Sequence, residues 1–218
     1  MEVAYLNSPS QFEIINWNRF SSTLIIEVER NKKIYTSTAV VVGKNMLITA
    51  AHSVDQFDRG AIVVGDSYKN AQDKIEIKRC YIHPGYNPSK SLYVNDIAVI
   101  ILNKNLPDNI FIEKIPESIS LGPGEVLDRV GFGMRENKNI RTWTNPSFVT
   151  STFNLTNFIL EDTLSVVGDS GGPIYRNNNG ELELIGIHST LEGSNKTYIV
   201  NLAYYKDWIE EHRALRSI

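Results

Sequence analysis

Short apolar runs, separated by polar and turn-forming residues, make up most of this chain. The runs are rich in Val, Ile, Thr and Tyr, and clusters of Gly, Asn, Pro and Asp lie between them, which is typical of short β-strands. The expected strands span residues 22–30, 36–43, 45–52, 61–65, 73–82, 96–102, 126–133, 171–175, 181–189 and 197–202. An Asn-Gly pair within residues 176–181 predicts a tight hairpin turn. The pattern predicts an all-β protein built from barrels or sandwiches.

Only the C-terminal part has a helical pattern. In residues 203–216, Tyr204, Trp208 and Leu215 fall on one face, with charged residues opposite. A Gly-Pro-Gly sequence within residues 120–126 cannot continue a strand, so we expect the chain to cross there between two halves. We expect one domain over residues 1–218, with halves at about 20–119 and 120–202 and a helix at 203–216.

Composition narrows the class of protein. The chain has 218 residues, which is enough to bury a core without disulfides, and its one cysteine, Cys80, cannot form an intrachain bridge. The net charge is −3 and the basic residues are scattered, which argues against a nucleic-acid partner. The apolar runs are too short to span a membrane. With no signal-peptide pattern at the start, these features predict a cytoplasmic protein, or a secreted one if the sequence is a mature fragment.

The stretch VVGDSGGPIY, residues 166–175, places Ser170 between glycines. It formally fits G-x-S-x-G, the nucleophile elbow of α/β-hydrolases, which needs a helix after the serine. Here Pro173 and a hairpin pattern follow, so the elbow is rejected.

A different order of residues, His then Asp then Ser, explains the motif. The stretch ITAAHSV places His52 at the end of an apolar strand, and YVNDIAVIIL places Asp96 at the start of another. Together with VGFG, GDSGGPIY and LIGIHS, these stretches resemble the chymotrypsin/trypsin-like serine protease family, from about residue 22 to the C-terminal helix. The resemblance implies a single trypsin-like protease domain: two six-stranded antiparallel β-barrels with the active site between them, and a C-terminal α-helix.

The resemblance also implies roles for individual residues. Ser170 matches the nucleophile, His52 the general base and acid, and Asp96 the carboxylate that orients the imidazole. The backbone N–H groups of Gly168 and Ser170 match the oxyanion hole, and Ser189 matches a serine that supports the aspartate. The implied reaction is hydrolysis of protein or peptide substrates through an acyl-enzyme, without a cofactor or metal. A catalytically silent binding module on the same fold is the alternative.

The side chain preferred before the cut remains open between two hypotheses. The residue six before the nucleophile lies at the pocket floor in this family, and here it is Leu164, which cannot pair with a basic side chain, so a trypsin-like preference is not expected. His188 and Ser165 resemble the pocket of bacterial glutamyl endopeptidases and favour Glu or Asp. An apolar pocket of Leu164, Val167 and Leu191 is the competing hypothesis. The candidate pocket residues are Leu164, Ser165, His188, Ser189, Thr190 and Leu191.

Asp169 raises the question of activation. In trypsin-like relatives the matching aspartate pairs with an α-amino group that proteolysis creates, and this pairing orders the pocket. The nearest candidate segment is EIINW, where cleavage after Glu13 would expose Ile14. If the uncut chain is active, Asp169 needs another partner or an activating protein.

Overall fold

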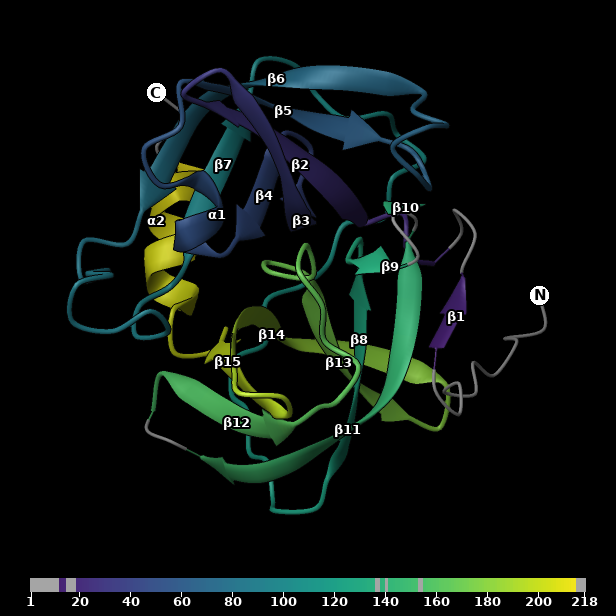
Figure 1. The fold of residues 1–218 in the computed structure, drawn as a ribbon, viewed down its shortest axis with the longest axis vertical. Coiled ribbons are helices and arrows are strands. Elements are labelled where there is room, and N and C mark those ends of the chain that lie inside the picture. The colour runs from purple at the N-terminus through teal and green to yellow at the C-terminus, as the bar shows by residue number, and fades with distance from the viewer. Residues whose placement is uncertain (1–11, 15–18, 136–137, 140, 153–154, 215–218) are drawn as a thin grey trace.

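A computed structural model describes residues 12–14, 19–135, 138–139, 141–152 and 155–214. Strands dominate, and they form two groups that follow one another along the chain (Figure 1). The predicted all-β class, with two barrels and a C-terminal helix, is confirmed.

Six strands of the N-terminal half close into a barrel. They are β2 (Thr23–Arg30), β3 (Lys33–Gly43), β4 (Met46–Thr49), β5 (Arg59–Val64), β6 (Asp73–Ile82) and β7 (Ala98–Leu102). All neighbours are antiparallel, and the order around the barrel is β2-β3-β4-β7-β6-β5.

The C-terminal half forms the second group, in the lower part of Figure 1. Its strands are β8 (Val126–Gly131), β11 (Thr142–Thr152), β12 (Asn157–Glu161), β13 (Pro173–Asn178), β14 (Glu181–Glu192) and β15 (Lys196–Asn201). Pairings run β8-β11-β12-β15-β14-β13 and return to β8, so these strands also form a closed ring. The short strand β1 (Phe12–Ile14) pairs with β11, and β9 (Met134–Arg135) pairs with β10 (Lys138–Asn139).

The continuous apolar runs of the N-terminal half have a structural reason. On β3, Ala39 and Val41 point into the barrel, whereas Val40 and Val42 join a second cluster that includes Val130 and Ile187 of the other half. Because side chains alternate along a strand, a strand with apolar residues at every position is buried on both faces. The two barrels therefore share an apolar interface, which fixes how the segments that carry the candidate site face one another.

The C-terminal helix α2 (Lys206–Ala214) lies beside the first barrel (Figure 1). The His212 ring packs on Tyr81 and Trp208, and the Trp208 ring meets His83 edge-on at 5.0 Å between centroids. Helix α2 thus returns from the second barrel to cover the end of β6. No helix among the described residues is long and apolar enough to cross a membrane.

Several boundaries differ from the prediction. The strand expected over 45–52 ends at Thr49, and the strand expected from residue 96 begins at Ala98. Strands β11 and β12 were not predicted, since Pro146 interrupts the apolar pattern of β11 and its register shifts between Thr144 and Ser147. The helix expected over 203–216 begins only at Lys206, and residues 215–216 lie outside the described part.

The predicted hairpin turn is present. Strand β13 ends at Asn178 and β14 begins at Glu181, so Asn179 and Gly180 form a two-residue turn. Both have positive φ, 54° and 92°, as a turn matched to the twist of the strands requires.

Candidate active site

His52 and Asp96 come together between the end of β4 and the start of β7. Nδ1 of His52 lies 2.8 Å from Oδ2 of Asp96, and the backbone N–H of His52 donates to Oδ1 at 2.9 Å. The Asp96 side chain has no solvent exposure, whereas 31% of the His52 side chain is exposed. The carboxylate therefore holds the imidazole from the buried side and leaves its other face open to a substrate.

His52 does not continue β4, contrary to the expectation. It lies in a one-turn helix, α1 (Ala51–Val54), whose N-terminus has no side-chain cap of its own. Asp96 accepts the free N–H of His52, and Arg30 donates to the carbonyls of His52 and Ser53 at the other end. Both ends of this turn are thus fixed by residues from elsewhere in the first barrel.

Ser170 lies in the loop between β12 and β13, and this loop docks on the first barrel. The carbonyl of Ser170 accepts hydrogen bonds from the Thr38 backbone N–H at 3.0 Å and from the Ser37 hydroxyl at 2.7 Å. Gly171 has φ +80°, and a Cβ there would lie 2.1 Å from Thr49 Oγ1. Only glycine permits this approach, so the conformation of the loop places Ser170 at the junction of the barrels.

The Ser170 hydroxyl is not bonded to His52 in this structure. Its Oγ donates to the carbonyl of Ser189 at 3.2 Å, and no hydrogen bond joins it to His52 within the described part of the chain. The Ser189 hydroxyl in turn donates to Asp96 Oδ2 at 2.5 Å. Ser189 therefore contacts both the candidate nucleophile Ser170 and the carboxylate of Asp96. The sequence predicted only its contact with Asp96.

Gly168 has a backbone conformation that favours glycine. Its φ is +100°, and its carbonyl accepts a hydrogen bond from the Thr38 hydroxyl at 2.7 Å. Within the described residues neither the N–H of Gly168 nor that of Ser170 donates a hydrogen bond. Two main-chain donors beside the candidate nucleophile are thus available to an oxygen of a substrate.

Ser165 and His188, predicted from separate segments to share a pocket, are in direct contact. Ser165 Oγ lies 2.7 Å from His188 Nε2, and His188 Nδ1 lies 3.1 Å from the carbonyl of Ser189. A carbonyl only accepts, so Nδ1 carries the proton and Ser165 donates to Nε2. Burial, together with the positive charge of Arg129, lowers the pKa of His188 to about 3. The His188 side chain is therefore neutral at pH 7 when no substrate is bound.

Two residues of the competing apolar pocket, Val167 and Leu191, lie exposed at the surface. Val167 is 82% exposed and Leu191 is 41% exposed. Neither they nor Leu164 belong to a hydrophobic cluster among the described residues. Thr190, also assigned to the pocket, follows His188 and Ser189 on β14, where the pairing with β15 shifts register.

Asp169 is buried and already paired with arginines. Arg135 donates to its Oδ1 at 3.1 Å and to its Oδ2 at 2.7 Å, and Arg129 Nε lies 3.4 Å from Oδ2. Burial alone would raise the pKa of Asp169, but the two guanidinium groups outweigh it and the pKa lies below its ordinary value. The expected partner, Ile14, lies in β1, where its backbone pairs with Thr142 of β11. The side chain of Ile14 lies outside the described part.

Sequence reasoning missed both arginines and the role of Asp162. Asp162 is fully buried, and its carboxylate is occupied by Arg129 and by the N–H of Leu164. It is not available to a basic side chain of a substrate. One signal was present in the sequence, because Asp128 and Arg129 interrupt the apolar run at residues 126–133 and a buried charge needs a partner.

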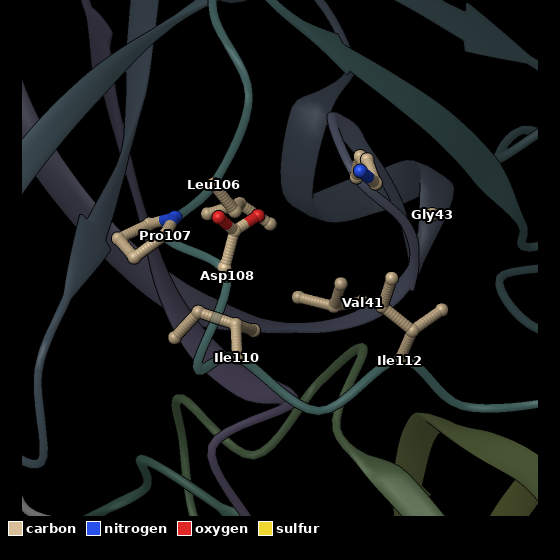
Figure 2. A pocket seen from close by; sticks show the side chains of 8 residues that line it. Val41, Gly43, Leu106, Pro107, Asp108, Ile110 and Ile112 are labelled. Atoms are coloured by element: carbon tan, nitrogen blue, oxygen red, sulfur yellow. The ribbon is translucent and has the colours of Figure 1, made fainter.

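A small apolar pocket lies elsewhere, beneath the segment that follows β7 (Figure 2). It is lined by Val41, Gly43, Lys44, Leu106, Pro107, Asp108, Ile110 and Ile112. None of the predicted site residues lines it.

Comparisons with known proteins identify the family of the chain. The trypsin family model matches residues 17–209. CLIP domain-containing serine protease B4 of Anopheles gambiae is 26% identical over 245 residues, which cover 89% of this chain and 67% of that protein. Trypsin zeta of Drosophila erecta is 24% identical over 217 residues, which cover 80% of this chain and 72% of that protein.

Solved structures share the fold at low identity. HL collagenase has a TM-score of 0.78 and 16% identity, covering 94% of this chain and 98% of its own. VesB protease of Vibrio cholerae has a TM-score of 0.76 and 21% identity, covering 93% and 67%. An inactivated protease paralogue of the scabies mite has a TM-score of 0.77 and 16% identity, covering 94% and 99%.

The double-barrel fold and the family match define a serine endopeptidase, a hydrolase of protein or peptide substrates. The chain belongs to the trypsin family.

Proposed function

We propose that His52, Asp96 and Ser170 form the catalytic triad of this endopeptidase. The observation that carries the proposal is the contact of the partly exposed His52 with the fully buried Asp96. A serine hydroxyl is a weak nucleophile until a base removes its proton, and a neutral imidazole is such a base. The proposed mechanism requires the Ser170 hydroxyl to turn from the Ser189 carbonyl toward His52.

The chemistry then follows from the positions of these groups. Ser170 Oγ attacks the carbonyl carbon of the substrate while His52 Nε2 takes the hydroxyl proton, and Asp96 stabilises the resulting imidazolium. The oxygen that becomes negative receives hydrogen bonds from the N–H groups of Gly168 and Ser170. The C–N bond breaks as His52 returns the proton to the leaving amine, which leaves an acyl-enzyme on Ser170. Water, deprotonated by His52, hydrolyses this ester.

Labelling with a fluorophosphonate tests the triad. The reagent reacts with a serine hydroxyl only where a base activates it, so the wild-type chain should be labelled and the Ser170→Ala variant should not. Ser194→Ala, an exposed serine, is the matched control. The alternative, a silent binding module, predicts no labelling of the correctly folded wild type. An inactivated protease paralogue of the scabies mite has a similar fold, so this fold occurs in proteins without protease activity.

We further propose that the pocket prefers Glu or Asp before the cut, and that the Ser165–His188 pair recognises this side chain. The pair supports the proposal because it places two hydrogen-bonding side chains in contact, one of them on the loop that carries Ser170. A substrate carboxylate requires a donor, so its entry redirects the Ser165 hydroxyl or protonates Nε2 of His188. Only the second route takes up a proton, so the pH dependence of kcat/KM with Glu distinguishes the two.

Matched peptides that differ only in Glu, Leu, Phe or Arg before the cut test this preference. The acidic pocket predicts the highest kcat/KM with Glu, and Ser165→Ala should lower the Glu-to-Leu ratio about 10-fold or more, because a hydrogen bond to a charged group is lost. An apolar pocket predicts that Leu or Phe is cleaved fastest and that Ser165→Ala leaves the ratio unchanged. Cleavage only after Arg would contradict both.

Two routes of activation are proposed for the endopeptidase, a cut after Glu13 and the binding of a partner protein. Either route is needed only if no cation pairs with Asp169 in the uncut chain. N-terminal sequencing of labelled, active protein distinguishes these routes, because a cut form begins at Ile14. A cytoplasmic location and the absence of nucleic-acid and membrane partners remain predictions from the sequence.

A further inference from the structure

The buried carboxylate of Asp169 needs a positively charged partner. Its carboxylate has no exposure to water, and a buried charge without a partner is costly. Backbone N–H groups of Gly133 and Val166 donate to it at 3.0 and 3.1 Å. These bonds orient the carboxylate but supply no positive charge, so a cation must come from a side chain or from a chain terminus.

Arg135 supplies this cation in the uncut chain. Its guanidinium contacts both oxygens of Asp169 in the two-pronged geometry that is strongest for a carboxylate, and the same group donates to the carbonyl of Leu164 at 2.7 Å. The side chain is 15% exposed, so it reaches the buried carboxylate from the surface of the second barrel.

Arg129 completes a charge-balanced cluster. It lies behind Asp169, fully buried, and pairs with Asp162 at the other end of the same loop. Two guanidinium groups thus face two carboxylates. Burial lowers the pKa of Arg129 only to about 10, so it keeps its charge at neutral pH.

The two arginines hold the loop of residues 162–170 at three points. Arg129 holds Asp162, Arg135 holds the backbone at Leu164, and both hold Asp169. This loop carries the pocket residue Ser165, the oxyanion donor Gly168 and the nucleophile. Its ordering therefore depends on groups that are present before any cleavage.

We propose that Arg135 is a positioning residue that takes the place of the α-amino group created by proteolysis in relatives, so that the uncut chain is an active endopeptidase. Arg129 anchors the buried end of the same cluster. The proposal rests on the proposed function, because it concerns the order of the same nucleophile loop.

The first test asks whether cleavage matters. A full chain with Glu13→Gln, which removes the expected cut site, is labelled with fluorophosphonate and its intact mass is measured. It is compared with a full chain in which an enteropeptidase site directly precedes Ile14, before and after cleavage. The proposal predicts labelling of the uncut chains at a rate within about 3-fold of the cut chain. Labelling of the cut form alone would overturn it while leaving the proposed function intact.

The second test asks whether the guanidinium is responsible. Arg135→Gln should lower the labelling rate and kcat about 100-fold, as expected when an oxyanion hole is disordered. Arg135→Lys should recover most of the rate because it restores the charge. Added methylguanidinium should partly restore Arg135→Ala, a readout that a general loss of stability would not give. Arg176→Gln, a surface arginine on β13, is the matched control and should be unchanged.

The outcomes separate the two proposals. If Arg135→Gln is folded, by its melting curve, and labels like the wild type, the role of Arg135 is wrong but the triad stands. If neither cut nor uncut chain is labelled, the proposed function fails, and the role of Arg135 fails with it.

Discussion

One carboxylate, that of Asp96, binds His52 twice, through the backbone N–H at 2.9 Å and through ring Nδ1 at 2.8 Å. The first contact satisfies the free N-terminus of the turn α1, and the second selects the tautomer in which Nε2 is free to accept a proton. The position of the turn and the tautomer of the ring are therefore controlled by the same buried group.

Asp96→Asn should separate these two effects. The amide oxygen can still accept the backbone N–H of His52, so the fold should be retained. The amide NH₂, however, faces Nδ1 and favours the wrong tautomer. We expect kcat to fall about 10⁴-fold, the order of magnitude established for this change in serine protease triads. Steady-state kinetics on a cleaved peptide measure it, with circular dichroism as the control for folding. A drop of less than 10-fold would contradict the assignment of Asp96.

Ser189→Ala removes a hydrogen bond to a buried charge. The hydroxyl donates to Asp96 at 2.5 Å, and both side chains are fully buried. Bonds to charged groups contribute about 1.5–3 kcal/mol, so we expect the free energy of unfolding to fall by that amount. Urea denaturation measures the loss, and the exposed Ser194→Ala should show none. Equal stability of both variants would mean that the Asp96–Ser189 bond does not form.

The candidate triad could be named from the sequence because short stretches that resemble the trypsin-like family carry its three members. Of the contacts such a triad needs, the structure contains the one between His52 and Asp96, and the catalytic role of the three residues stays a prediction. The apolar strands of the first barrel were predictable because burial on both faces leaves long unbroken runs. Strand β11 was not, because Pro146 and a shift of register break its pattern.

The environment of Asp169 could not be predicted in the same way. Its partners Arg129 and Arg135 lie more than 30 residues earlier, on different elements, and only the closure of the second barrel brings them to the loop. Local patterns report which face of a strand is buried, but they do not report which charge lies opposite. The partner of a buried charge is therefore the part of this site for which a structure was needed.

Gly168→Ala tests the oxyanion donors. The residue has φ +100°, and an added Cβ would lie 3.1 Å from the carbonyl oxygen of Phe132. Backbone strain of this kind costs about 1–3 kcal/mol, and relief of the strain turns the N–H away from the substrate. We expect kcat to fall by about 10²-fold or more with little change in KM. Gly122→Ala, where a Cβ meets nothing within 4 Å, should match the wild type in both constants. A larger effect on KM than on kcat would contradict the role of Gly168.

His188 should make the protein sensitive to mild acid. Burial lowers its pKa from 6.5 to about 3, so below pH 6.5 the unfolded chain takes up a proton that the folded chain refuses. The contribution of His188 to the free energy of unfolding is therefore fully present above pH 6.5 and is lost as the pH falls toward 3. At 1.36 kcal/mol per pH unit, the loss between pH 6.5 and 4.5 is about 2–3 kcal/mol.

The variant His188→Gln isolates this contribution. His83 and His212, whose pKa values burial also lowers, remain in the variant, so the difference between the two proteins reports His188 alone. Urea denaturation at pH 7.0, 5.5 and 4.5 should show a steeper fall for the wild type, because glutamine does not titrate. Asp169, whose pKa lies below its ordinary value of 3.8, is present in both proteins, so its contribution at low pH cancels in the comparison. Parallel stability curves for the two proteins from pH 7.0 to 4.5 would mean that the pKa of His188 in the folded chain is not lowered, and hence that the pocket gains a cation as the pH falls below 6.5.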